Sequence, residues 1–240
     1  MKISRFYQAT SIVVSEDLEL STENHRHAIQ VLRLKVNDTL VLFNDEGGEY
    51  LATLTHIDKR KSSVRIDSFS SVNRESPLHI TLALATIKPD KMDFAIQKAV
   101  ELGVSVIQPM TTNRSVIKIK RLEKKMSHWQ GVIVAACEQS GRTVIPQLNE
   151  PLNFDKCLKN ATGTCITMLP NASQKITDLE PDKKNLISLF VGPEGGFTDE
   201  EEKLMMQHSF QTINFGPRIL RAETAVIAGI TACQIQWGDI

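Results

Sequence analysis

The segment of this chain best suited to hold a ligand is the glycine-rich sequence LFVGPEGGFT at residues 189–198. An apolar run ends there, and Thr198 with Glu201 three residues later predicts a capping box at the start of a helix. In parallel α/β sheets, ligands bind beside the carboxyl ends of strands, where such strand-to-helix loops lie. The alternative is a tight turn whose glycines serve only the geometry of the backbone.

The composition of this loop restricts the ligand. The loop matches neither of the common phosphate-binding patterns, GxxxxGK[ST] and GxGxxG. Pro193 removes one backbone N–H donor, Glu194 would repel phosphate groups, and no lysine follows to compensate. A ligand that carries adenosine hydroxyls without phosphates therefore suits the loop better than ATP or NAD. S-adenosylmethionine, with its cationic sulfonium, meets this description.

A second polar cluster follows a later strand, in the sequence FGPRILRAETA at residues 215–225. Apolar elements flank it on both sides, so its polar residues must lie beside the core; they are Arg218, Arg221, Glu223 and Thr224. Charged groups in such a place are costly unless they are paired or used. An internal Arg–Glu pair with a threonine helix cap is the structural alternative.

A third cluster ends a predicted helix, where the sequence AACEQSGR occupies residues 135–142. The apolar side of this helix belongs to the core, whereas Glu138, Gln139 and Arg142 gather at its C-terminal end. Ordinary solvated helix-end residues would explain the same pattern. A basic stretch at residues 118–125 indicates either another solvated face or a contact with a polyanion.

The elements that must position these clusters change character along the chain. A short helix is expected between Ser21 and Arg33, among β-rich segments with strands at 39–43, 49–57 and 63–67. A polar linker follows at residues 70–77. Beyond it, strands predicted at 79–87, 104–110, 165–169, 186–191 and 212–215 alternate with helices at 90–103, 122–141 and 223–237. This alternation implies a parallel sheet covered by helices on both faces, and we expect domains at 1–72 and 77–240.

The overall composition excludes several classes of protein. The 240 residues contain 28 Lys and Arg against 28 Asp and Glu, so any nucleic-acid partner must be held by local basic patches. No apolar run approaches the roughly 18–20 residues of a membrane helix, and the N-terminal residues lack the apolar stretch of a secretory signal. The four cysteines have no metal-ligand spacing, so we expect no metal site. Most fall in apolar patterns, so we expect core residues, and the lack of a disulfide framework indicates a reducing, cytoplasmic setting. They are Cys137, Cys157, Cys165 and Cys233.

Taken together and in this order, four stretches resemble the ribosomal RNA small subunit methyltransferase E family, a family of the SPOUT methyltransferases. They are DFAIQKAVELG at 93–103, ACEQSGR at 136–142, VGPEGGF at 191–197 and GPRILRAETA at 216–225. The stretches SRF at 4–6, HAIQVLR at 27–33 and GGEY at 47–50 are similar to the small β-barrel domain of that family. The similarity therefore runs along nearly the whole chain.

This resemblance implies a fold and an activity. The fold is α/β, a SPOUT-type parallel sheet with a C-terminal trefoil knot, preceded by a small PUA-like β-barrel domain that binds RNA. The activity is methylation of N3 of one uridine in 16S ribosomal RNA by a homodimer that uses S-adenosylmethionine, on RNA within the assembled small subunit. The residues that match the cofactor-binding motifs of the family are Leu169, Gly192, Glu194, Gly195, Gly196, Ile219, Leu220, Arg221, Thr224 and Ala225.

The implied chemistry requires further residues. N3 of uridine attacks the methyl group only after losing its imide proton, so the enzyme needs a proton acceptor and a cation that stabilises the anion. Arg221 is the candidate cation, and Glu223 or Glu138 is the candidate acceptor. Arg5, Arg33 and Lys35 are candidates for contacts with RNA phosphates.

Two other function classes remain open at this point. One is a catalytically silent RNA-binding protein on the same scaffold, which only an assay of methyl transfer excludes. The other is a phosphate-handling enzyme that uses the glycine loop, although Glu194 and the absence of a loop lysine count against it.

Overall fold

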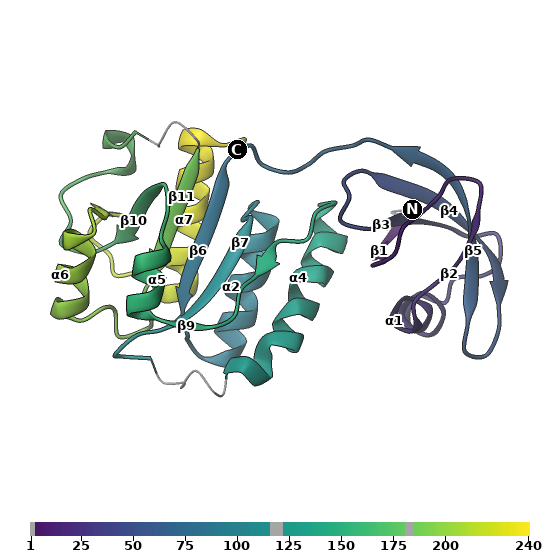
Figure 1. Cartoon of the computed structure of the whole chain (residues 1–240), viewed down its shortest axis with the longest axis horizontal. Coiled ribbons are helices and arrows are strands. Elements are labelled where there is room, and N and C mark those ends of the chain that lie inside the picture. Colours follow the sequence, from purple (N-terminus) through teal and green to yellow (C-terminus); the bar gives the residue numbers. More distant parts are fainter. Residues whose placement is uncertain (1–2, 116–121, 181–184) are drawn as a thin grey trace. The chain divides into compact units, whose positions relative to one another are not determined.

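The chain forms two compact units, which we describe separately (Figure 1). The N-terminal unit comprises Met1–Glu75 with Cys137–Ile145, and the C-terminal unit comprises Ser76–Ala136 with Pro146–Ile240. The computed structural model describes residues 3–115, 122–180 and 185–240, so the basic stretch at 118–125 lies partly outside it. Within these ranges no helix has both the length and the apolar character needed to cross a membrane.

The N-terminal unit is built on a sheet of five strands in the order β1-β3-β4-β5-β2. The strands are β1 (Ser4–Tyr7), β2 (Asp17–Glu19), β3 (Thr39–Phe43), β4 (Glu49–Ile57) and β5 (Ser62–Ser70). Only β1 and β3 pair in parallel, and the other pairs are antiparallel. Apolar side chains at alternate positions form its core, including Phe6, Leu40, Leu42, Leu54 and Ile66. This β-rich unit agrees with the sequence pattern.

The strands predicted at 39–43 and 49–57 are β3 and β4, and a hairpin joins them. Asp45, Gly47 and Gly48 all have φ values between 71° and 83°, the left-handed region that turns require and that glycine enters without steric cost. A Cβ on Gly48 would lie 2.5 Å from the Phe69 ring, so no larger residue fits there without movement.

The short helix expected after Ser21 is also present, in two parts. Helix α1 (Thr22–His25) begins at Ser21, whose side chain accepts a hydrogen bond from the Asn24 N–H at 3.1 Å. A π-helical segment (Arg26–Val31) continues it, which the sequence pattern did not predict.

The C-terminal end of the third cluster belongs to the N-terminal unit. Arg142 is only 6% exposed, and its Nε donates to the Glu75 carboxylate at 2.8 Å. The same carboxylate accepts the backbone N–H groups of Thr143 and Val144 at 3.1 and 3.3 Å. Arg142 is therefore a buried ion-pair residue, and its interpretation as a solvated helix end is wrong. Removing one partner of such a buried pair costs about 3–5 kcal/mol.

The C-terminal unit contains the predicted parallel sheet, in the order β12-β10-β11-β6-β7-β8 with β9 beside β7. All of these pairings are parallel. The strands are β6 (His79–Ala85), β7 (Val106–Thr111), β8 (Gln147–Leu148), β9 (Leu152–Asn153), β10 (Thr164–Met168), β11 (Leu186–Val191) and β12 (Gln211–Ile213). Strands β10, β11, β6 and β7 follow one another in this order across the unit, from left to right in Figure 1.

Helices cover both faces of this sheet, as the alternation of elements predicted. They are α2 (Pro89–Glu101), α4 (Met126–Ser140), α5 (Phe154–Asn160), α6 (Asp199–Gln207) and α7 (Ala222–Trp237), with short 3-10 turns at Glu123–Lys125 and Ile176–Asp178. On one face Ala83 and Phe190 pack with Phe154 of α5 and Met205 of α6. Helix α7 packs against β11 and α2.

One predicted helix boundary needs correction. The sequence pattern placed the start of helix α2 at residue 90, but Lys88 is the N-cap and Pro89 takes the first helical position. Proline suits that position because its missing N–H would have no partner within the helix and its φ is already helical. Asp90 lies in the first turn, where a carboxylate interacts favourably with the helix dipole.

The cysteines are unpaired, and most are core residues, as expected. Cys137, Cys157 and Cys233 are buried, and burial raises the pKa of each thiol to about 12. Cys165 is half-buried. In the part of the chain that the structure describes, no group of three His, Cys, Asp or Glu side chains could hold a metal ion.

Candidate functional site

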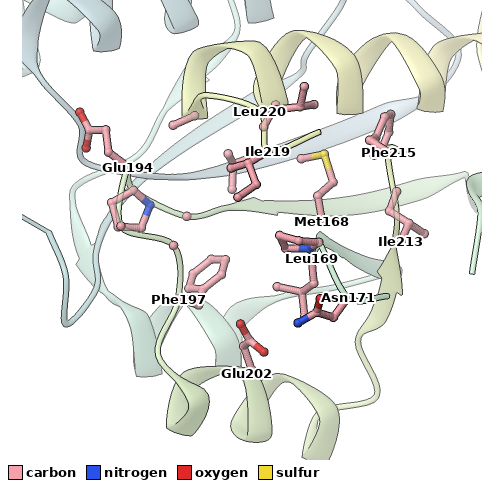
Figure 2. Close-up of a pocket in the computed structure, with 18 of the residues that line it drawn as sticks. Met168, Leu169, Asn171, Glu194, Phe197, Glu202, Ile213, Phe215, Ile219 and Leu220 are labelled. Atoms are coloured by element: carbon pink, nitrogen blue, oxygen red, sulfur yellow. The ribbon is translucent and has the colours of Figure 1, made fainter. Parts of the chain in front are cut away.

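A cavity of about 430 Å³ lies in the C-terminal unit, at the carboxyl ends of β10, β11 and β12 (Figure 2). The loops that follow these three strands supply most of its wall, from residues within 168–171, 191–197 and 213–222. Parallel strands end at one edge of the sheet, so segments far apart in the sequence meet there. The glycine-rich loop and the second polar cluster thus contribute to the same cavity.

Most of the predicted cofactor-binding residues line this cavity. They are Leu169, Gly192, Glu194, Gly195, Gly196, Ile219, Leu220 and Ala225. Two predicted residues, Arg221 and Thr224, lie outside the cavity wall, and both are exposed. Arg221 is the N-cap of α7, and its carbonyl accepts the Ala225 N–H at 2.8 Å.

The glycine-rich loop has the strand–turn–helix form that its sequence predicted. Gly196 has a φ of 70°, and its N–H donates to the Pro193 carbonyl at 2.8 Å, which closes the turn. The capping box is confirmed, because the Thr198 N–H donates to Glu201 at 2.9 Å and Thr198 Oγ1 accepts the Glu201 N–H at 3.2 Å. Helix α6 therefore begins at a fixed position beside the cavity.

Several residues of the wall were not among the predicted site residues. Phe197 and Phe215 lie within the quoted motifs but were not named as site residues, whereas four others belong to no motif: Arg114, Met168, Asn171 and Glu202. Arg114 follows β7, so the rule that ligands meet strand ends could have suggested it, but nothing in its local sequence marks it. Burial raises the pKa of Glu202, Asp199 raises it further, and Arg114 acts in the opposite direction.

Glu223 lies next to this wall, between Ala222 and Ala225 on α7. The residue is 8% exposed, and its carboxylate is 3.8 Å from the Lys91 ammonium. Its ion-pair partner among the described residues is thus a lysine, and helix α7 is capped by Arg221. The alternative of an internal Arg–Glu pair with a threonine cap is wrong.

Comparison with known proteins identifies the family. The sequence model of the RNA methyltransferase domain matches residues 74–234, and that of the RNA methyltransferase PUA domain matches residues 20–67. The ribosomal RNA small subunit methyltransferase E of Buchnera aphidicola from Schizaphis graminum is 36% identical over 243 residues, 100% of this chain and 98% of that protein. The chain belongs to the ribosomal RNA small subunit methyltransferase E family.

Another member of the family and two solved structures support this assignment, which the sequence motifs predicted. The methyltransferase E of Bacillus subtilis is 29% identical and covers 90% of this chain. The crystal structure of methyltransferase E from Neisseria gonorrhoeae, bound to S-adenosyl methionine, superposes with a TM-score of 0.93 at 36% identity. A methyltransferase from Legionella pneumophila, in complex with the bound cofactor SAM, reaches 0.95 at 38% identity. Both structures cover 100% of both chains.

Glu138, a candidate proton acceptor for a methyltransferase of this family, lies in the N-terminal unit. Its carboxylate accepts the backbone N–H of Tyr7 at 3.0 Å. Burial raises the pKa of Glu138 above the usual carboxyl value, although the hydrogen bond from Tyr7 opposes the shift. The carboxylate thus has a structural partner in the described unit, and the cavity wall does not include it.

The pKa of Glu138 predicts a pH dependence of stability. Because the folded pKa exceeds the unfolded pKa, the native state binds more protons, and Glu138 contributes less stability as pH rises from about 4 through its folded pKa. Urea unfolding should therefore show Glu138→Gln gaining stability relative to the wild type between pH 4 and pH 7.

Glu49 provides the opposite case as a control. Burial raises its pKa, but hydrogen bonds and charges of Arg5 and Arg74 lower it more, so the net direction is downward. Glu49→Gln should lose stability relative to the wild type over the same rise in pH, since ionised Glu49 stabilises the fold above its unfolded pKa. Parallel curves for Glu138→Gln and the wild type would contradict the burial argument.

The three candidate RNA-binding residues have different surroundings within the N-terminal unit. Arg33 and Lys35 are exposed, and Arg33 has a φ of 58° in the turn before β3. The Arg5 side chain is only 10% exposed, forms an ion pair with Glu49 and donates to the carbonyls of Gly141 and Arg142 at 3.2 and 3.1 Å. Arg33 and Lys35 are therefore more accessible to a phosphate group than Arg5.

Proposed function

We propose that this chain is an S-adenosylmethionine-dependent methyltransferase that modifies N3 of a uridine in 16S ribosomal RNA. The observation that carries this proposal is the cavity at the ends of β10, β11 and β12, formed by the glycine-rich and RILRAETA loops. Relatives over the full chain length are named for methylation of small-subunit RNA, and two full-length structural neighbours hold S-adenosylmethionine.

The residues of the cavity fit this cofactor. Its volume of about 430 Å³ falls in the range of small-molecule and cofactor sites, roughly 300–1,000 Å³. Glycines at 192, 195 and 196 have no side chains that would keep a ligand away from the backbone, and the carboxylates of Glu194 and Glu202 favour a cationic group. The wall contains no lysine among the described residues; its two arginines are Arg218 and Arg114, and Arg114 already donates to two carbonyls of the glycine-rich loop.

In the mechanism we propose, the chain supplies binding, alignment and proton chemistry. When bound, S-adenosylmethionine supplies an electrophilic methyl group. Backbone N–H and C=O groups of the two loops would hold the adenine and ribose, and the exposed Arg221 would stabilise negative charge at O2 or O4 of the uracil. Glu223 would accept the N3 proton, because it lies in the same unit as the cavity and beside its wall.

The alternative proton acceptor is Glu138, and paired variants separate the two. Glu223→Gln should lower kcat on small subunits by about 10²- to 10⁴-fold, and its rate should rise with pH because solvent then removes the N3 proton. Glu138→Gln should stay within about threefold of the wild type, since glutamine can still accept the Tyr7 N–H. The reverse result would assign proton transfer to Glu138.

We further propose how the rest of the chain serves this reaction. The N-terminal region, 1–72, would dock on RNA as a PUA-like barrel through Arg33 and Lys35, with Arg5 as a partly buried contributor. Residues 77–240 would form the methyltransferase domain, with a trefoil knot, in a homodimer acting on the assembled subunit in the cytoplasm. The match of the RNA methyltransferase PUA domain model to residues 20–67 supports the proposal that the N-terminal region binds RNA.

Calorimetry tests the assignment of the cofactor. The purified chain should bind S-adenosylmethionine and S-adenosylhomocysteine and should not bind ATP or NAD. Binding of ATP or NAD alone would favour the phosphate-handling enzyme. Cofactor binding without any methyl transfer to unmodified subunits would leave a catalytically silent RNA-binding protein.

A further inference from the structure

We infer that Arg114 is the positioning residue of the glycine-rich loop, and that it holds residues 192–197 in the shape that receives the cofactor. This inference rests on the proposed function of the cavity. Arg114 lies in the segment after β7, outside every motif that marked the site in the sequence.

The contacts of Arg114 with this loop are specific. Its Nη1 donates to the Gly195 carbonyl at 2.7 Å and to the Phe197 carbonyl at 2.9 Å. The two acceptors bracket Gly196, the residue with positive φ. A guanidinium that binds carbonyls on both sides of this turn fixes the direction of the peptide groups between them.

Packing at Gly195 supports the same role. A Cβ built on Gly195 would lie 3.3 Å from Cδ and 3.5 Å from Cβ of Arg114. The loop backbone therefore lies directly against the aliphatic part of the arginine. A side chain at Gly195 would therefore require Arg114 to shift by a few tenths of an ångström, and this constraint is steric, because the φ of Gly195 is not in the left-handed region.

The turn that carries Arg114 is itself held in place. Ser115 Oγ accepts the Thr112 N–H at 3.0 Å, and the Ser115 N–H donates to the Thr112 carbonyl at 3.1 Å. The backbone N–H of Asn113 donates to Glu201 at 2.8 Å, and Glu201 also forms the capping box of α6. Arg114 thus acts from a turn that is anchored to the element following the loop.

The sheet order explains why an arginine is suited to this task. Strand β6 lies between β7 and β11, so the turn after β7 must reach across the end of β6 to contact the loop after β11. The loop after β6 adds its own contact, because the Lys88 N–H donates to Glu194 at 3.1 Å. Two neighbouring strand ends thereby hold the glycine-rich loop from one side, through Lys88 and Arg114.

The test compares Arg114→Ala with Arg114→Lys and with Asn113→Ala. Calorimetry with S-adenosylhomocysteine should show binding about tenfold weaker in Arg114→Ala, the loss expected for one charge-assisted hydrogen-bond site. Lysine should restore only part of the affinity, because its side chain is one atom shorter and lacks the fixed planar geometry that directs the two N–H groups of Nη1 at the two carbonyls. Asn113→Ala should bind like the wild type, since Asn113 donates through its backbone.

Kinetics distinguish positioning from a general structural defect. In Arg114→Ala the KM for S-adenosylmethionine should rise with the dissociation constant, while kcat at saturating cofactor stays within about threefold. A fall in kcat with unchanged KM, or wild-type affinity in Arg114→Ala, would overturn the inference. If the wild-type chain itself bound no S-adenosylhomocysteine, the proposed function would fail instead.

Discussion

Replacing Arg221 by alanine should lower kcat on small ribosomal subunits by about 10²- to 10³-fold while leaving the affinity for S-adenosylhomocysteine within threefold of the wild type. The expected loss is that of one preorganised donor to a developing oxyanion. Arg221 caps helix α7 through its backbone, and its side chain makes no capping hydrogen bond. Arg221 is exposed, and its neighbours in the chain, Leu220 and Ala222, belong to the cavity wall. Its guanidinium is therefore placed to meet a substrate at the rim of the cavity.

Two further variants control for charge and geometry at Arg221. Lys203→Ala removes an equal charge from an exposed position on α6 and should change kcat by less than about twofold, which separates local from long-range electrostatics. Arg221→Lys should recover part of the rate, because the charge stays but the fork of donors is lost. An unchanged rate in Arg221→Ala would remove this residue from the mechanism. A large loss of cofactor affinity would instead place it in the cofactor site.

Gly192→Val should weaken binding of S-adenosylhomocysteine by about 100-fold or more. A Cβ on Gly192 would lie 3.2 Å from the Phe197 ring and 3.4 Å from the Gly196 carbonyl carbon, so the branched side chain must displace the loop or enter the cavity. The φ of Gly192 is not positive, so this effect is steric and does not arise from backbone strain. Calorimetry measures the loss directly.

Gly131→Val is the matched control for this substitution. Gly131 lies on the exposed side of α4, its φ is not positive, and no atom lies within 4 Å of an added Cβ. This variant should bind S-adenosylhomocysteine like the wild type. Circular dichroism would check that both variants are folded, since overpacking alone costs roughly 1–3 kcal/mol. Affinity in Gly192→Val within threefold of the wild type would show that the loop does not contact the ligand.

The sequence predicted the parts of the site that local patterns specify. The turn at Gly196 and the capping box at Thr198 depend on residues within a few positions of one another, so their conformations follow from the types of those residues. The shared edge of β10, β11 and β12 followed from the alternation of strands and helices. That the glycine-rich and RILRAETA loops contribute to one cofactor site was implied by the resemblance to the family.

Sequence patterns could not predict which residues far apart in the chain form ion pairs or hydrogen bonds. Arg5 and Glu49, or Glu75 and Arg142, lie far apart in the chain, and only the folded backbone shows that they are partners. Arg114 was missed for the same reason, since its carbonyl partners belong to a loop that is adjacent only in space. Short strands such as β8 and β9 contain too few residues to show a period.

The most direct test of the proposed function is methyl transfer to a defined RNA. Small ribosomal subunits would be purified from a strain that lacks this protein, incubated with the chain and S-adenosylmethionine, and their 16S RNA mapped by mass spectrometry of its nucleosides. We predict one new N3-methyluridine, absent when Arg221→Ala replaces the wild type for the same short incubation. No new methylated nucleoside, or a methyl group on a different base, would contradict the proposed function.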